Sequence, residues 1–111
     1  MQGIVVDVEM RQIRREGFDA VALTPMQTAL MTLYARHAPR PIHDDRILVY
    51  YWTEKEEPRR NLWVFVCQVN KRLAPIHLML RRSFEFGYYL VDCPQPVMAA
   101  AKDAVMEAIR G

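Results

Sequence analysis

The chain of 111 residues contains little cysteine and little glycine, and it has no long apolar run. Its two cysteines, Cys67 and Cys93, form no CxxC motif or Cys/His cluster, which excludes a disulfide framework and gives no indication of a zinc site. Apolar runs such as 62–67 and 97–101 are far shorter than the roughly 20 residues that span a bilayer. Acidic residues at positions 7 and 9 are unlike a signal peptide. We therefore expect a cytoplasmic protein with reduced thiols and no membrane partner.

Sequence motifs of catalysis are also missing. The chain has no GxSxG, no P-loop and no HExxH motif, and no pair of carboxylates in a setting that would separate their pKa values. Asp44 and Asp45 are adequately explained as acidic residues at the start of a helix. His37, His43 and His77 are scattered over different expected elements, so no metal site is indicated. The sequence predicts neither an enzyme nor a bound cofactor.

The composition is that of one ordinary globular domain, with 51% apolar and 25% charged residues. Fifteen basic residues against thirteen acidic ones give a net charge of +2, which is too small to indicate a nucleic-acid binder by itself. The distribution is more informative, because basic pairs stand at 59–60, 71–72 and 81–82, close together in the sequence. A fourth pair, Arg14 and Arg15, lies beside Gly17 and is expected in a solvated turn.

The N-terminal part predicts small antiparallel strands followed by a helix. A β-branched run at 4–8 and a loosely alternating stretch at 10–23 are typical of strands. Thr24, Pro25 and Gln27 then match a helix start with a capping box. The expected helix carries Leu30, Leu33, Tyr34 and His37 along one side, and the prolines at 39 and 41 end it.

The rest of the chain predicts two more helices, a hairpin and an added helix. A short helix is expected from 43 or 44 to 51 or 52, then a loop at 53–58 and a helix at 59–73. That third helix has a narrow apolar stripe made by Leu62, Val66, Val69 and Leu73. The β-rich segment 76–91 predicts a hairpin, and 97–110 an amphipathic helix. The order indicates an α+β winged helix-turn-helix domain over 1–91, a linker over 92–96 and a C-terminal helix within 97–111.

Four blocks of sequence lie in the order and spacing of one family. They are LTP, LM, L and ARH within 23–37, IL and YW within 47–52, LWV and NKRL within 62–73, and FGYYL at 86–90. These blocks resemble the LTPxE…LLxxLxxH opening, the LxxxVW helix, the VDVHIxxLRxKL recognition helix and the GxGYxL wing of the DNA-binding effector domain of OmpR/PhoB-type response regulators. The resemblance covers 5–91. It implies a winged-helix transcriptional regulator that binds double-stranded DNA. A chain of this length does not hold the family's receiver domain as well, so we expect a stand-alone effector domain.

The expected third helix supplies the main candidate DNA-binding residues. With its stripe turned inward, the outward face suits the major groove. The amides of Asn61 and Gln68 match adenine, and Val64 matches a thymine methyl group. Basic residues near this face and on the wing are assigned to phosphates or guanine. The complete predicted set is Arg59, Arg60, Asn61, Val64, Gln68, Lys71, Arg72, Arg81 and Arg82.

Several aromatic residues depart from the family pattern and keep a second interpretation open. Trp63 and Phe65 flank the third helix, where they either complete the core or form a partner surface. Phe84 stands at the wing tip in place of the family's basic residue, and Glu85 follows where glycine is usual. A winged-helix protein–protein interaction module that has lost DNA binding, with Trp63, Phe65 and Phe84 as its partner surface, is the alternative. The suggested partners are then a homodimer through 97–110 or a protein such as the transcription machinery.

Overall fold

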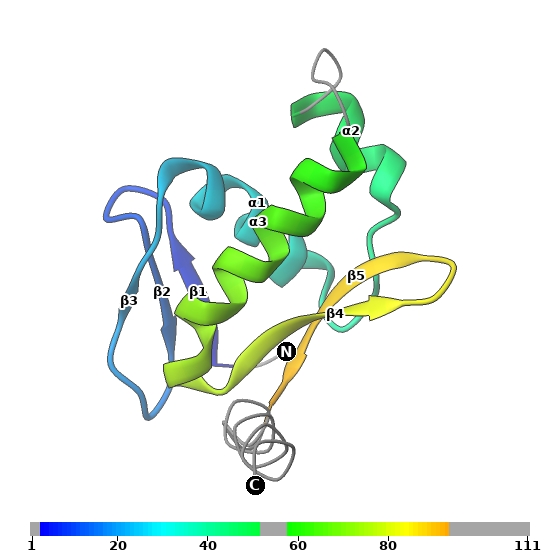
Figure 1. The fold of residues 1–111 in the computed structure, drawn as a ribbon. Coiled ribbons are helices and arrows are strands. Elements are labelled where there is room, and N and C mark those ends of the chain that lie inside the picture. Colours follow the sequence, from blue (N-terminus) through cyan, green and yellow to red (C-terminus); the bar gives the residue numbers. More distant parts are fainter. Residues whose placement is uncertain (1–2, 52–57, 94–111) are drawn as a thin grey trace, which may run out of the picture.

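The computed structural model describes residues 3–51 and 58–93. Over these residues the chain is an α+β fold with three α-helices and two antiparallel sheets (Figure 1). The elements are β1 (Ile4–Asp7), β2 (Gln12–Arg15), β3 (Val21–Ala22), α1 (Pro25–His37), α2 (Asp44–Tyr51), α3 (Pro58–Leu73), a 3-10 turn (Ala74–Ile76), β4 (Leu78–Ser83) and β5 (Gly87–Asp92). The α+β class and the order of these elements are confirmed. The expected helix at 97–110 lies outside the described residues, as does the expected loop apart from its last residue.

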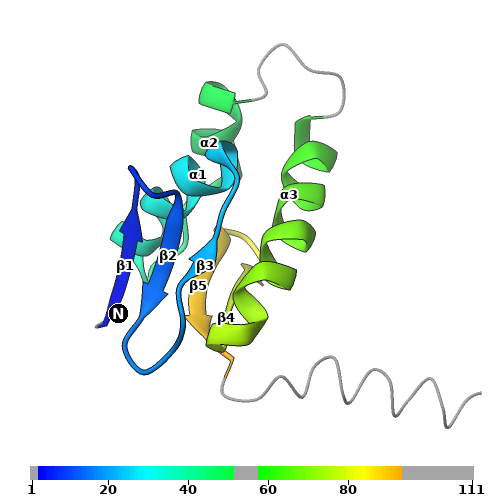
Figure 2. The same cartoon turned by 90° about the vertical axis from the view of Figure 1, so that its left-hand side faces the viewer.

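The two sheets lie at the two ends of the described chain. The first has the strand order β1-β2-β3, and the second is the hairpin β4–β5. In the first sheet Val6 pairs with Ile13, and the side chain of Ile13 is fully buried. Figure 2 shows this sheet on one side of the body and α3 on the other. Within the described ranges no helix is both long and apolar enough to cross a bilayer.

The start of α1 is confirmed in atomic detail. The backbone N–H of Gln27 donates to the Thr24 hydroxyl oxygen (3.2 Å), and the backbone N–H of Thr24 donates to the Gln27 side-chain oxygen (3.0 Å). This capping box satisfies backbone donors that the helix itself leaves without partners. Leu30 and Tyr34 are buried as expected, whereas Leu33 and His37 are half-buried, and Met31 takes a place in the core.

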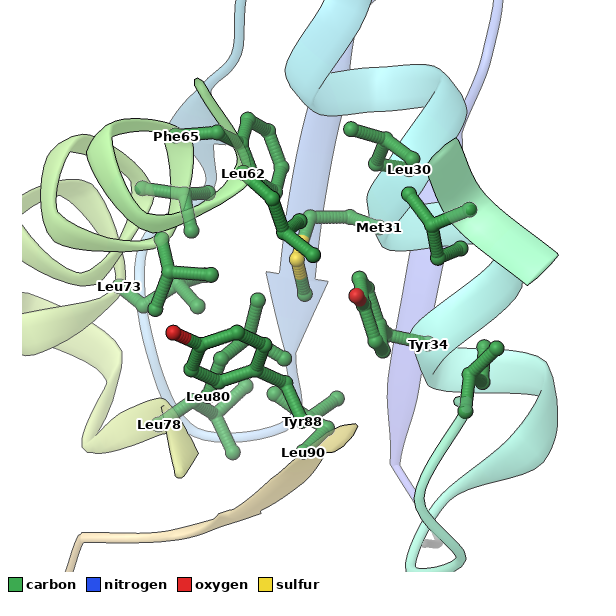
Figure 3. Close-up of a cluster of buried hydrophobic side chains, with 14 of the residues drawn as sticks. Leu30, Met31, Tyr34, Leu62, Phe65, Leu73, Leu78, Leu80, Tyr88 and Leu90 are labelled. Atoms are coloured by element: carbon green, nitrogen blue, oxygen red, sulfur yellow. The ribbon is translucent and has the colours of Figure 1, made fainter. Parts of the chain in front are cut away.

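The core lies between α1, α3 and the hairpin. All members of the predicted α3 stripe are buried: Leu62, Val66, Val69 and Leu73. The helix begins at Pro58, one residue earlier than expected, which agrees with the preference of proline for a first turn. Figure 3 shows side chains of α3 meeting Leu30, Met31 and Tyr34 of α1 and residues of both hairpin strands.

Arg15 corrects one expectation, because it does not lie in a solvated turn. Its guanidinium donates to the carbonyl oxygens of Ile76 (2.9 Å) and His77 (2.8 Å) and pairs with the carboxylate of Asp92. It also lies 5.4 Å from the ring centre of Phe18. The physical reason is strand alternation: Arg15 shares a face of β2 with the buried Ile13 and is therefore turned toward the body. Arg15 ties the first sheet to the base of the hairpin.

Candidate nucleic-acid interface

The outward face of α3 is the candidate site. Arg60, Val64, Cys67, Gln68 and Lys71 are exposed there, in agreement with the helical spacing. The side chains of Gln68 and Lys71 make no hydrogen bond or ion pair with any residue that the structure describes. Their polar groups are therefore available to a partner.

Asn61 and the two α3 aromatics differ in how far they reach solvent. Asn61 was expected to point outward, but its side chain is half-buried rather than exposed. Phe65 is buried and completes the core, which is one of the two roles expected for it, and it is therefore not part of an exposed partner surface. Its position, three residues from Leu62 and four from Val69, places it beside the buried stripe. Trp63 lies toward the other flank and stays 57% exposed.

The hairpin is attached to α3 by one side chain that the sequence did not single out. The Asn70 amide N–H donates to the carbonyl oxygen of Leu80 (3.0 Å), and the backbone N–H of Leu80 donates to Asn70 Oδ1 (2.7 Å). These two bonds fix β4 against the C-terminal half of the helix (Figure 1). In the sequence, the one indication of this role was that Asn70 places a polar amide at the edge of the apolar stripe of α3.

A second attachment joins the hairpin to the segment before α2. The backbone N–H of Ile42 donates to the carbonyl oxygen of Tyr88 (3.0 Å). Gly87 lies so close to this segment that a Cβ atom would stand 1.9 Å from the Ile42 carbonyl oxygen, and its φ of +102° also favours glycine. Gly87, the glycine of the expected hairpin, therefore allows the hairpin backbone to lie close to the backbone of Ile42.

Asp44 is more than an acidic residue at a helix start, so the explanation by capping alone is incomplete. Its side chain is 7% exposed, and its Oδ2 lies 2.6 Å from Arg82 Nη1 and 3.6 Å from Arg59 Nη1. Arg59 also donates to Asp45 (3.1 Å). Asp44 Oδ1 is buried and has no hydrogen-bond partner among the described residues. One buried carboxylate thus links the start of α3 to the hairpin.

The two wing arginines have different surroundings. Arg82 pairs with Tyr88 across the hairpin and lies 5.0 Å from its ring centre. The hydrogen bond to Asp44 raises the pKa of Arg82, so this guanidinium stays charged and held. Arg81 faces the opposite side of β4, is exposed, and has no ion pair or side-chain hydrogen bond within the described part of the chain. Of these two arginines, Arg81 is therefore the one whose guanidinium has no partner within the described chain.

Arg72, another predicted contact, is also engaged within the protein. Its guanidinium donates to the carbonyl oxygen of Ala22 at the end of β3 (3.0 Å). Arg59, Arg72 and Arg82 thus hold elements together. Among the predicted residues, Gln68, Lys71 and Arg81 are exposed and make no side-chain hydrogen bond or ion pair within the described chain, and Arg60 and Val64 are exposed beside them.

Cys67 and Cys93 are not joined in a disulfide. Cys67 is exposed on the outward face of α3, whereas Cys93 is half-buried just after β5. The two thiols therefore report on different parts of the surface.

No protein-family model matches the chain, and the curated proteins yield no match either. The resemblance to the effector domains is carried by its four blocks of sequence alone.

Proposed function

We propose that the chain is a winged-helix transcriptional regulator that places α3 in the major groove of double-stranded DNA and the β4–β5 hairpin, its wing, against the flanking backbone. One observation carries the proposal. The outward face of α3 presents Gln68 and Lys71 without partners in the described chain, beside a hairpin that Asn70 fixes in place. The order of elements and the resemblance to OmpR/PhoB-type effector domains support the same function.

The chemistry of this face suits base edges more than a dense phosphate contact. An α-helix of about 10–12 Å diameter fits a major groove about 12 Å wide. Gln68 has the paired donor and acceptor that match adenine, and Val64 offers an apolar contact to a thymine methyl group. Arg60 and Lys71 lie near the two ends of this face and suit phosphates or guanine.

A salt titration tests the proposal quantitatively. Lys71 and Arg81 are exposed basic residues without a side-chain partner among the described residues, whereas Arg59, Arg72 and Arg82 are bound within the protein. Two phosphate contacts predict a slope of log K against log salt of about −1.8, or a loss of about 12-fold between 50 and 200 mM salt. Fluorescence anisotropy with a labelled duplex of mixed sequence measures this. Binding that does not change with salt contradicts the proposal.

The two cysteines provide an independent test with an internal control. Bound duplex covers the outward face of α3, so we expect it to slow alkylation of Cys67 at least several-fold while leaving Cys93 unchanged. Mass spectrometry after a timed maleimide pulse, with and without saturating duplex, reads both thiols in one sample. Equal rates at Cys67 in both samples remove α3 from the interface.

A specific observation also supports the alternative, a protein–protein interaction module. Trp63 is 57% exposed on α3 and Phe84 is 93% exposed at the hairpin tip, and exposed aromatic surface is typical of partner sites. This alternative predicts no salt-dependent binding to duplex DNA and no protection of Cys67 by it. The two measurements above therefore distinguish the two functions.

A further inference from the structure

The tip of the hairpin is unusually apolar for a surface turn. Phe84 is 93% exposed, the highest fraction among the large apolar side chains of the described residues, and Phe86 is 60% exposed. Between them lies Glu85, which is also exposed. The turn itself is closed by a bond from the backbone N–H of Phe86 to the carbonyl oxygen of Ser83 (3.3 Å). The tip therefore presents two exposed phenylalanines, with an exposed glutamate between them in the sequence.

The strands that carry this tip are held by several different elements. Asn70 of α3 bonds both backbone groups of Leu80, and the segment before α2 bonds Tyr88. The ion pair between Arg82 and Asp44 adds a side-chain link. Figure 1 shows the turn at the far end of the hairpin, projecting from the body. The rings are therefore presented on a firm support, which lowers the entropy that binding would cost.

Taken without Trp63, the tip is too small for a stable protein interface, and its charge is unsuited to a membrane. Two phenyl side chains offer about 300–500 Å² at the 150–250 Å² typical of one aromatic residue. A stable protein interface needs about 800 Å² from each partner. Hydrocarbon is disfavoured because Glu85 would enter it together with the rings. The tip therefore suits a partner with a narrow slot that accepts one phenyl ring.

Stacked base pairs are such a partner. Proteins that bend DNA insert apolar side chains, phenylalanine among them, between base steps from the minor groove. Arg81, exposed on the same hairpin, supplies a positive charge for the adjacent phosphates. The carboxylate of Glu85 would repel a phosphate close to the tip. Insertion of a phenyl ring between bases is therefore the favourable contact of the tip with DNA.

We propose that Phe84 is an apolar wedge, which enters the minor groove beside the site of α3, opens one base step and bends the duplex. The proposal rests on the DNA binding proposed above. Pyrimidine–purine steps unstack most easily, so a TA or CA step is expected at the position of the wedge, without any hydrogen bond to its bases.

The test combines a bend measurement with a local probe of stacking. A duplex is first selected from a random library with the chain of 111 residues. Energy transfer between dyes at its ends measures the bend, and 2-aminopurine placed at successive flanking positions reports unstacking. With the unaltered protein we expect a bend of about 20–90° and a rise of at least twofold in 2-aminopurine fluorescence at one step.

Matched variants separate the wedge from general effects. Phe84→Ala is expected to abolish the bend and the fluorescence rise while keeping the salt dependence of binding, and Phe84→Leu is expected to restore part of both. Tyr50→Ala is the control, since Tyr50 is an aromatic residue on α2 that is 80% exposed. It should leave both signals unchanged. Circular dichroism confirms that each variant is folded.

The possible failures are distinguishable. Salt-dependent binding of the unaltered protein without any bend or unstacking overturns the wedge and leaves the proposed function standing. A bend that persists in Phe84→Ala also overturns the wedge. If the unaltered protein binds no duplex at all, both the wedge and the proposed function are wrong.

Discussion

Replacing Arg82 by alanine should destabilise the fold far more than replacing its neighbour Arg81, although the sequence treats them as one basic pair. Arg82→Ala leaves the carboxylate of Asp44, only 7% exposed, with Arg59 at 3.6 Å as its remaining ion-pair partner. Breaking a fully buried pair costs about 3–5 kcal/mol. The Arg82 side chain is itself 45% exposed and Arg59 compensates part of the charge, so we expect a loss of about 2 kcal/mol.

Urea unfolding followed by circular dichroism measures this loss. The m-value of urea unfolding should stay unchanged. In thermal unfolding, a reduction of about 2 kcal/mol lowers Tm by about 8–16 °C in a domain of this size. Arg81→Ala is the matched control, because that side chain has no partner among the described residues, and it should stay within about 0.5 kcal/mol.

The double variant Asp44→Asn/Arg82→Ala tests whether the unpaired charge of Asp44 causes this loss. Removing the charge of Asp44 removes the cost of leaving it unpaired, so the double variant should be more stable than Arg82→Ala alone. The reasoning is refuted if Arg82→Ala costs no more than Arg81→Ala, or if the second substitution recovers no stability.

In DNA titrations Arg81→Ala should have the larger effect of the two substitutions. It should reduce the salt slope by about one unit, while Arg82→Ala should leave the slope unchanged.

Further predictions concern the core, the hairpin, the reading face and the C-terminal segment. Burial, and next the charge of Asp44, raise the pKa of Tyr34 above its ordinary 10.0, so stability that is present below pH 10 is lost as the pH rises beyond it. Because its hydroxyl has no partner among the described residues, Tyr34→Phe should keep or raise stability by up to about 1 kcal/mol at pH 7 and weaken the alkaline loss in urea titrations. Gly87→Ala should cost at least about 3 kcal/mol by thermal unfolding, since its Cβ would collide with a backbone oxygen, and a smaller loss would contradict the close approach. Gln68→Ala should relax base preference in a binding-site library without changing Tm, because a lost bidentate contact costs about 1–3 kcal/mol of discrimination, and an unchanged preference removes it from the reading set. Truncation after Asp92 should lower the mass measured by light scattering if 97–110 joins two copies, and an unchanged mass argues against that dimer.

Short-range patterns were sufficient for the order of the helices and strands in the described residues, although Ile76, expected in the hairpin, lies in a 3-10 turn and Asp92, expected in the linker, lies in β5. The capping box of Thr24 and Gln27 involves residues three apart, so its geometry follows once a helix starts there. The stripe from Leu62 to Leu73 defines the buried side of α3 by helical period alone. The outward position of Gln68 and Lys71 follows from the same period, and the sequence therefore identified most of the candidate face.

Local sequence is sufficient to specify which elements form and which side of each turns inward, because these depend on neighbours a few residues away. The polar side chains that hold the elements together are specified by long-range contacts in the fold. Arg15, Asp44 and Asn70 have partners tens of residues away or on another element, and no local pattern separates them from solvated residues of the same type. The same holds for the difference between Arg81 and Arg82. Adjacent residues on a strand face opposite sides, and the fold brings the carboxylate of Asp44 next to Arg82.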